Sequence, residues 1–181
     1  MFPLRLSEDA DPVRPRARRT LSSRIIRFDD PCRGERRRVE QFIEAAYAEA
    51  YGGQIQAHFP TLMSVQDEAG VIYAAVGFRH AAEAPLYLEQ YLDGSVETVL
   101  SQAIGAVIDR AQVVEIGSLA SSGQGATVFL FAAMAHHLQS EGLRFAVATA
   151  TDELRRIFHK AGLGALQLAR ADPRRLDDGG G

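Results

Sequence analysis

Apolar residues recur in the first third of this chain at the spacing of an amphipathic helix. From Glu35 onward, one apolar face is formed at positions i, i+3, i+4, i+7 and i+8 by Val39, Phe42, Ile43, Ala46 and Tyr47. A helix is the structure that brings these positions to one side. Gly52 and Gly53 follow and predict where the helix ends.

Short apolar or alternating runs, separated by turn residues, predict strands in the rest of the chain. The predicted strands lie at 23–27, 61–66, 71–79, 113–120, 145–150 and, weakly, 165–169. A tight turn at 67–70 joins the second and third strands as a hairpin, and Gly117 interrupts the fourth. The segment 85–92 is expected to be extended or irregular.

Three further helices are predicted, at 95–106, 127–139 and 151–162. The second of them is almost entirely apolar, which predicts a buried helix. The third begins at the capping residue Thr151 and ends at Gly162. This order of strands and helices predicts an α/β fold, with a mixed central sheet and flanking helices.

Length and composition indicate one globular domain with polar ends. The chain has 181 residues, of which 46% are hydrophobic and 24% charged, as is typical of a folded domain with its own core. Residues 1–20, rich in Pro, Arg and Asp, are expected to form a flexible basic arm. The domain is expected over residues 21–173, and a disordered tail over residues 174–181.

Positive charge is concentrated at the N-terminal end, although the net charge of the chain is −3. The first 38 positions contain 11 of the 20 Lys and Arg residues and six of the 23 Asp and Glu residues. This end would attract a phosphate or an acidic carrier protein, or it is simply a solvated tail and first helical turn. Its arginines have no interleaved aromatic residues, so nucleic-acid binding is not expected.

Several classes of protein are excluded by what the sequence lacks. The longest apolar run, 126–135, is about half the ~20 residues that a membrane-spanning helix needs. The start of the chain lacks the basic and apolar stretches of a signal peptide, so a cytoplasmic protein is expected. The single cysteine, Cys32, excludes an internal disulfide and a Cys-rich metal site. No metal site is expected, because the histidines, including His136 and His137, lack ligand spacing.

A glycine turn after the 113–120 strand is the strongest candidate for a binding site. It leads into a helix and comprises Ser121, Ser122, Gly123, Gln124, Gly125 and Ala126. Free N–H groups at a helix N-terminus suit an anion such as a pyrophosphate or phosphopantetheine, and glycines let the ligand approach closely. The alternative is an ordinary strand-to-helix turn in which the serines cap the helix.

The order of elements around this turn resembles the GNAT-type acyl-CoA N-acyltransferase fold, whose phosphate loop follows the fourth strand. A closer resemblance, spanning about 24–173, is to the thermostable hemolysins, a bacterial family similar in turn to acyl-homoserine-lactone synthases. It rests on LEQYLD (88–93), VEIGSLAS (114–121), TATDELRRIFHKAGL (149–163) and, more weakly, HFP (58–60) and GFR (77–79).

The resemblance implies roles for two charged residues. Glu115 stands where the synthases have the Glu of an E-x-S-R motif at the amine acceptor, which makes it a candidate general base. Arg79 stands where those synthases have a strand arginine that contacts the acceptor side of the active site. The arginine of E-x-S-R is absent here, which argues against a lactone product and against S-adenosylmethionine as the acceptor. The alternative for Glu115 is a structural carboxylate that faces solvent or pairs with Arg79.

Two residues of LEQYLD and the interrupted strand supply the remaining candidates. Glu89 and Tyr91 line an acyl or acceptor pocket in one interpretation and are ordinary edge-strand residues in the other. Tyr91 is also a candidate general acid to the leaving thiolate. Backbone N–H groups at Gly117, Ser118 and Leu119 are expected to hold the thioester carbonyl and its developing negative charge.

The predicted function is an acyltransferase. The donor would be acyl-CoA or the acyl-phosphopantetheine of an acyl carrier protein, the acceptor an amino acid or related small amine, and no metal would be needed. Two alternatives stay open: a membrane-active haemolysin, and an inactive module that binds acyl thioesters. A homodimer is also left open. Family members continue past the stretch that corresponds to ADPRRL (171–176) with a W-G-x-Y-Y segment, whereas this chain has no tryptophan and ends in three glycines. A diverged or shortened C-terminus is therefore expected.

Overall fold

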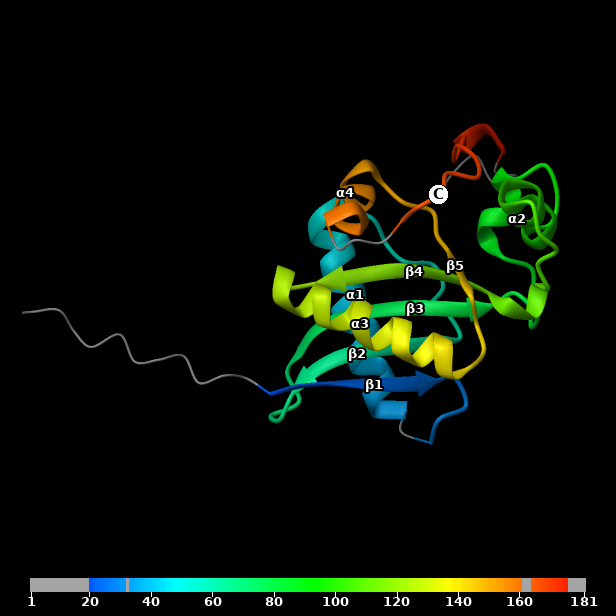
Figure 1. The fold of residues 1–181 in the computed structure, drawn as a ribbon. Coiled ribbons are helices and arrows are strands. Elements are labelled where there is room, and N and C mark those ends of the chain that lie inside the picture. The colour runs from blue at the N-terminus through cyan, green and yellow to red at the C-terminus, as the bar shows by residue number, and fades with distance from the viewer. Residues whose placement is uncertain (1–19, 32, 161–163, 176–181) are drawn as a thin grey trace, which may run out of the picture.

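The computed structural model describes residues 20–31, 33–160 and 164–175 (Figure 1). Except for Thr20, the expected N-terminal arm lies outside this part of the chain. The same holds for the expected tail from residue 176 onward.

A single five-stranded sheet forms the centre of the molecule, with the strands in sequence order. Its strands are β1 (Leu21–Arg27), β2 (Thr61–Asp67), β3 (Ile72–His80), β4 (Val113–Ser121) and β5 (Phe145–Val147). Neighbouring strands are antiparallel except β4 and β5, which are parallel. The predicted mixed α/β sheet is therefore confirmed, and β5 is shorter than expected.

The weak final strand predicted at 165–169 is wrong, because these residues are assigned no strand. Leu168 is partly buried against the core, whereas Leu166 is 60% exposed. One apolar contact does not hold a segment in a sheet when its backbone gains no ladder partner.

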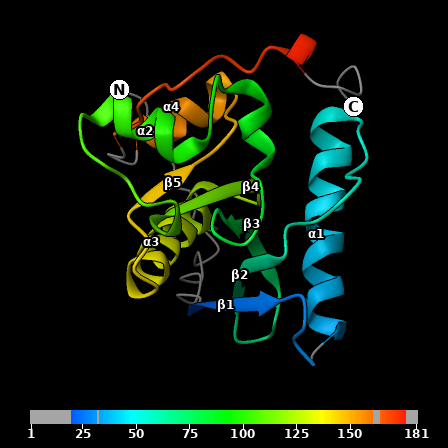
Figure 2. The same ribbon diagram turned by 90° about the vertical axis from the view of Figure 1, so that its right-hand side faces the viewer.

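Helices cover both faces of the sheet, with α1 on one side and α3 on the other (Figure 2). The α-helices are α1 (Arg33–Tyr51), α2 (Val96–Ile104), α3 (Gln124–Ser140) and α4 (Asp152–Lys160). Short 3-10 turns are η1 (Tyr87–Tyr91), η2 (Arg110–Gln112) and η3 (Pro173–Arg175). Among the residues that the structure describes, no helix is both long and apolar enough to cross a membrane.

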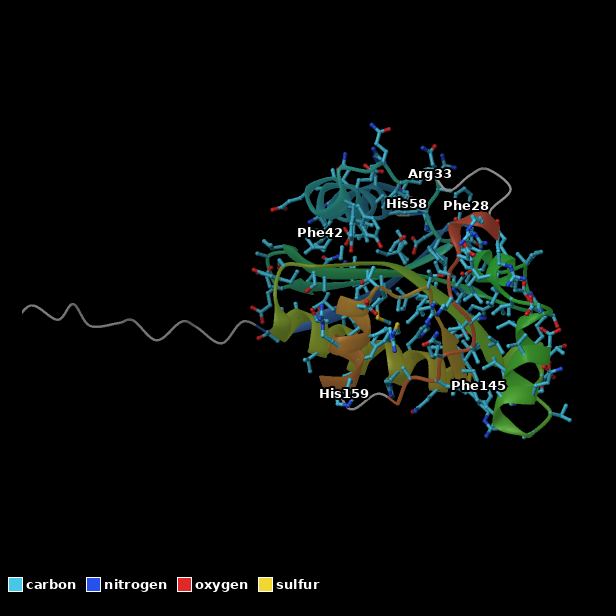
Figure 3. All side chains as sticks on the ribbon, turned by 90° about the horizontal axis from the view of Figure 1, so that it is seen from above. Phe28, Arg33, Phe42, His58, Phe145 and His159 are labelled. Carbon is cyan, nitrogen blue, oxygen red and sulfur yellow. The ribbon has the colours of Figure 1, made fainter. Side chains whose placement is uncertain are left out.

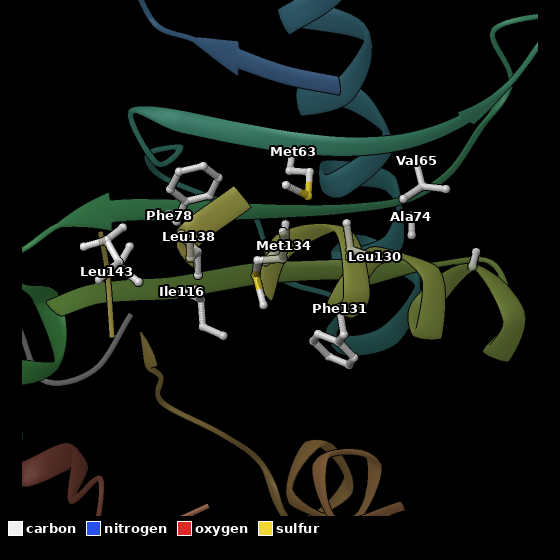
Figure 4. Close-up of a cluster of buried hydrophobic side chains, with 13 residues drawn as sticks. Met63, Val65, Ala74, Phe78, Ile116, Leu130, Phe131, Met134, Leu138 and Leu143 are labelled. Carbon is white, nitrogen blue, oxygen red and sulfur yellow. The ribbon is translucent and has the colours of Figure 1, made fainter. Parts of the chain in front are cut away.

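The core is divided between the two faces of the sheet. Leu130, Met134 and Leu138 of α3 pack on one face, against Phe78 and its neighbours (Figure 4). On the other face, α1 contributes Val39 and Ile43 to a cluster with residues of β1, β2, β3 and β4. These two contacts follow directly from the amphipathic pattern of α1 and from the buried stripe of α3.

Only one side of α3 is buried, although its composition predicted a wholly buried helix. Val128 is 62% exposed, and Ala132 and Ala135 are exposed as well. Alanine has the highest helix propensity and a single methyl group to hydrate, so alanine-rich exposed positions are tolerated. Apolar composition alone therefore did not distinguish the buried face from the exposed face.

Candidate active site

Strand β4 contains a bulge at the position where the sequence predicted an interruption. Gly117 pairs with Gly77 and Ala120 with Ala75, so β4 holds one residue more than β3 between these pairs. Ser118 lies in this stretch with φ at 52°, in the left-handed region. The interruption is therefore confirmed, with the strained residue at Ser118 rather than at Gly117. Such bulges re-aim backbone groups and are frequent beside active sites.

The bulge lies where the sheet opens on its β5 side. Strands β4 and β5 pair only from Val113 with Phe145 to Glu115 with Val147. Beyond Glu115, β4 continues to Ser121, and β5 diverges from it (Figure 1). The edge of β4 at the bulge therefore has no paired residue in β5, and this interruption of the ladder is called the gap below.

The glycine turn at the end of β4 leads directly into α3, which begins at Gln124, three residues earlier than predicted. Gly125 and Ala126 thus belong to the first helical turn, whose N–H groups have no partner within the helix. Both Gly123 and Gly125 are exposed, and a Cβ added at either would meet nothing within 4 Å. The turn is open to a ligand.

The two serines of the turn hold it in place. Ser122 donates to the Tyr73 carbonyl from both its N–H, at 2.8 Å, and its hydroxyl, at 3.1 Å. Ser121 Oγ donates to the Gly123 carbonyl at 2.9 Å and accepts from the Thr127 hydroxyl at 2.8 Å. Neither serine caps α3, whose N-cap residue is Gly123 and receives no side-chain cap.

Glu115 connects the two most specific sequence motifs. It is 3% exposed on β4, and its two carboxylate oxygens accept the N–H groups of Tyr87 and Leu88, each at 2.9 Å. Burial raises the pKa of Glu115, against the opposing effects of these two hydrogen bonds and of Arg79. The carboxylate that the resemblance placed at the acceptor therefore also fixes η1 to the sheet.

Arg79 is the cross-strand partner of Glu115 in the ladder between β3 and β4. Its guanidinium lies over the ring of Phe59, 5.7 Å from the centroid. It also donates to the Pro85 carbonyl at 3.4 Å. The structure thus brings together Arg79, Glu115 and the Phe59 ring on the α1 side of the sheet.

Glu89 anchors the segment between β3 and α2. Its carboxylate accepts the N–H groups of Leu86 and Val96, at 2.8 and 2.9 Å. It also forms a two-point ion pair with Arg110, at 2.6 and 3.0 Å. The Arg110 hydrogen bonds are the main reason that the pKa of Glu89 falls to about 2. The segment was expected to be irregular, and this network gives it a fixed shape.

Tyr91 is more deeply buried than Tyr87, the other tyrosine of η1. It is 8% exposed, whereas Tyr87 is 50% exposed, and their rings meet edge to face with centroids 6.2 Å apart. Burial raises the pKa of Tyr91, and the Tyr87 hydroxyl adds to this effect. Arg175 of η3 donates to the Tyr91 carbonyl at 2.6 Å, which connects η3 to η1.

Three residues near these groups were not singled out from the sequence: Arg36, Arg110 and Tyr87. From the sequence alone, Arg36 and Arg110 are indistinguishable from solvated basic residues, because most of their partners are distant in the chain. Tyr87 lies just outside the LEQYLD motif (88–93) and belongs to no motif. No cluster of three or more His, Cys, Asp or Glu side chains able to hold a metal ion occurs in the described parts of the chain.

Comparison with known proteins identifies the family and the fold of the chain. A family model described as thermostable hemolysin matches residues 30–180. No curated protein is a significant match to the chain. Three similar solved structures, each 13% identical, are the AHL synthase LasI, apo TofI, and the aminoglycoside acetyltransferase meta-AAC0020 from an uncultured soil metagenomic sample.

The three structures share most of their length with this chain. For LasI the TM-score is 0.59, with 83% of this chain and 85% of that chain covered. For TofI it is 0.56, with 77% and 76% covered, and for the acetyltransferase 0.51, with 81% and 90% covered. At this identity the likeness shows the fold, which is the GNAT-like fold that AHL synthases also have.

Proposed function

Because the chain belongs to the thermostable hemolysin family and has a GNAT-like fold, we propose that it is an acyltransferase. It would move an acyl group from an acyl thioester to the amine of a small acceptor, an amino acid or a related compound. One observation carries this proposal: the bulge of β4 faces the gap that opens beside β5, on the strand that ends in the open glycine turn of α3.

The donor would lie along the open edge of β4. Its phosphates would bind the N–H groups of the turn from Gly123 to Ala126, with the helix dipole of α3 adding to the attraction. Glu115 and Ser121 are six positions apart on β4, about 20 Å in a strand, which suits an extended phosphopantetheine arm. The same turn accepts acyl-CoA or the phosphopantetheine of an acyl carrier protein.

The bulge would stabilise the tetrahedral intermediate. Backbone N–H groups of the bulge, from among Gly117, Ser118 and Leu119, would hold the thioester oxygen as its negative charge develops, using those that do not bond to β3. The amine nitrogen attacks the thioester carbon, a C–N bond forms and the C–S bond breaks. The amine gives up a proton and the leaving thiolate gains one, so the step needs no metal and no covalent enzyme intermediate.

Glu115 and Tyr91 are the residues proposed for these proton transfers. A carboxylate with a raised pKa is a better base than an ordinary one, and Glu115 would take the amine proton directly or through a water molecule. Tyr91 keeps its phenolic proton because its pKa is raised, and it would donate to the thiolate. Arg79 would bind the acceptor beside Glu115, while Glu89 shapes that side of the site through Arg110 and the 86–96 segment.

Donor binding at the glycine turn is the first point to test. Replacing Gly125 by Leu should abolish binding of octanoyl-CoA, because the new side chain extends into the space over the helix N-terminus, where a Cβ meets nothing within 4 Å. Native mass spectrometry of the wild type and the variant measures the bound fraction, with octanoyl-CoA and separately with octanoyl-acyl carrier protein. Gly53→Leu is the matched control, since a Cβ there also meets nothing within 4 Å.

Equal binding by the wild type and Gly125→Leu would contradict the placement of the donor phosphates. If the wild type bound neither donor, the acyltransferase proposal would fail. Leakage of liposomes by the protein alone would then favour the membrane-active alternative.

A further inference from the structure

The side chain of Phe59 lies against the sheet directly beside the β4 bulge. It covers Gly77 of β3 and Gly117 of β4, which face each other across the ladder. A Cβ added at Gly77 would come within 2.7 Å of the Phe59 side chain, and so would a Cβ added at Gly117. The ring therefore occupies the space that two ordinary strand residues would fill.

This arrangement is costly for the sheet and needs a reason. Glycine in the interior of a strand loses more backbone entropy on folding than other residues do, and it supplies no side chain for cross-strand contact. Two opposed glycines in the middle strands are expected where another group must approach the backbone closely. Here that group is the aromatic ring of Phe59. It covers Gly117, which directly precedes Ser118, the strained residue of the bulge.

Helix α1 fixes the loop that carries this ring. Arg36 is 7% exposed and donates to the carbonyls of Phe59 and Pro60, at 2.8 and 2.9 Å. Its Nε also pairs with Glu40 at 2.9 Å. Nearby, His58 Nε2 and Glu44 form a hydrogen bond of 2.9 Å between the loop and α1, on the α1 side of the sheet (Figure 3).

An arginine buried at a helix–loop contact, with its fork on two consecutive carbonyls, fixes the loop in one conformation. The loop is therefore not a flexible connection between α1 and β2. Its main effect at the site is to hold the Phe59 ring between the two glycines and the Arg79 guanidinium.

We propose that Phe59 is a specificity-determining residue of the acceptor site, and that the acceptor is an α-amino acid with an apolar side chain. Phe59 would pack against that side chain, and Arg79 at the same ring would bind the carboxylate. Arg36 is a positioning residue that acts through Phe59. This inference rests on the proposed acyl transfer, and it narrows the acceptor from any small amine to one carrying both an apolar and an anionic group.

Binding of two reaction products tests the inference without requiring turnover. N-octanoyl-leucine and N-octanoyl-glycine share the acyl chain and the carboxylate and differ only in the apolar side chain. Isothermal titration should show that the wild type binds N-octanoyl-leucine at least about tenfold more tightly than N-octanoyl-glycine. This is the usual discrimination for one apolar group in a pocket. Phe59→Ala should remove this preference, and Phe42→Ala, in the same apolar cluster, should keep it.

The positioning role of Arg36 is tested by the same measurement, the preference for N-octanoyl-leucine over N-octanoyl-glycine. Arg36→Ala should reduce it, because the loop is released, and Arg36→Lys, which keeps one donor for the carbonyls, should retain part of it. If Phe59→Ala does not fold, Phe59→Trp provides the only tryptophan of the chain, and its fluorescence should respond to N-octanoyl-leucine at lower concentration than to N-octanoyl-glycine.

Equal affinity of the wild type for both compounds, or an unchanged preference in Phe59→Ala, overturns the inference. A separate assay of thiol release from octanoyl-CoA with leucine tests the reaction itself. Preferential binding of N-octanoyl-leucine without any thiol release would support the acceptor site and contradict the proposed function.

Discussion

At the scale of single residues, the candidate site depends on two kinds of residue. These are glycines whose missing side chains leave space for an aromatic ring, and carboxylates that are desolvated by burial. Gly77 and Gly117 admit the Phe59 ring to the backbone of the sheet. Glu115 and Glu89 are largely withdrawn from solvent, yet their pKa values move in opposite directions. Desolvation dominates for Glu115 and raises its pKa, whereas the Arg110 hydrogen bonds dominate for Glu89 and lower its pKa.

Replacing Gly77 by Ala should destabilise the protein by about 1–3 kcal/mol, the usual cost of overpacking. The added methyl would lie 2.7 Å from Phe59, whose loop is held by Arg36 and cannot simply withdraw. Urea denaturation followed by circular dichroism measures the free energy of unfolding. Gly53→Ala is the control, because a Cβ there meets nothing within 4 Å. Equal stability of the two variants would show that the ring moves freely.

Glu115→Gln should lower kcat for thiol release by about 100-fold or more, because the side chain keeps its shape but no longer takes the amine proton. Since burial raises the pKa of Glu115, the wild-type rate should fall on the acid side at a pH above the ordinary carboxyl value of 4.5. Stopped assays with octanoyl-CoA over a pH series measure both effects. Glu83→Gln, at an exposed position, should behave as wild type. A fully active Glu115→Gln protein would leave Glu115 with its structural role alone.

At the scale of elements, side-chain networks join segments that local propensity leaves undefined. Arg110 reaches from η2 to Glu89 and to Glu97 of α2, at 2.6 and 2.7 Å, and to the Ala81 carbonyl at 2.7 Å. Glu115 fixes the start of η1 in the same region. The residues between β3 and α2 are thereby given one conformation by partners that lie far away in the sequence.

Glu89→Gln should destabilise the protein by about 2–3 kcal/mol near neutral pH, in proportion to the lowered pKa. The pKa of Glu89 is about 2 in the folded protein and 4.5 in its reference state, so its stabilising effect is present above 4.5. The effect is lost as the pH falls from 4.5 toward about 2. Chemical denaturation at pH 7 and at pH values below 4.5 should therefore show the wild type and the variant converging in acid. A constant difference at every pH would contradict the ion-pair explanation.

At the scale of the whole molecule, the sheet is closed on one side of β4 and open on the other. Pairing with β3 continues from His80 with Val114 to Ala74 with Ser121, but pairing with β5 stops at Glu115. This asymmetry brings the bulge, the gap and the glycine turn of α3 into line along one strand. Each of these features is ordinary alone, and their alignment is the basis of the proposed site.

Donor binding should protect the open edge of β4 from hydrogen exchange. Octanoyl-CoA in the gap would shield the amides of residues 116–121 and of the first turn of α3, because they would lie against the ligand. Hydrogen–deuterium exchange with mass spectrometry measures this protection with and without octanoyl-CoA. Peptides from β1 and the first residues of β2 are the internal control and should be unaffected. Protection confined to β1, or absent from residues 116–126 when the donor is bound, would contradict the proposed binding mode.

The sequence alone determined most of the elements and their order. The i, i+3, i+4 spacing of α1 and the turn at 67–70 are local patterns, and a local pattern suffices because helix and hairpin geometry depend on neighbouring residues. The same holds for the interruption near Gly117 and for the glycine turn after β4. The motifs of the family also drew attention to Glu115, Arg79, Glu89 and Tyr91 as candidate site residues.

Only the tertiary structure decided what these residues do to one another. It showed that Glu115 holds η1, that Glu89 is paired with Arg110, and that Phe59 reaches the bulge through two opposed glycines. It also removed the expected strand at 165–169 and exposed one side of α3. These outcomes depend on partners distant in the chain, and burial, hydrogen-bond satisfaction and pKa are properties of such contacts rather than of the residues alone.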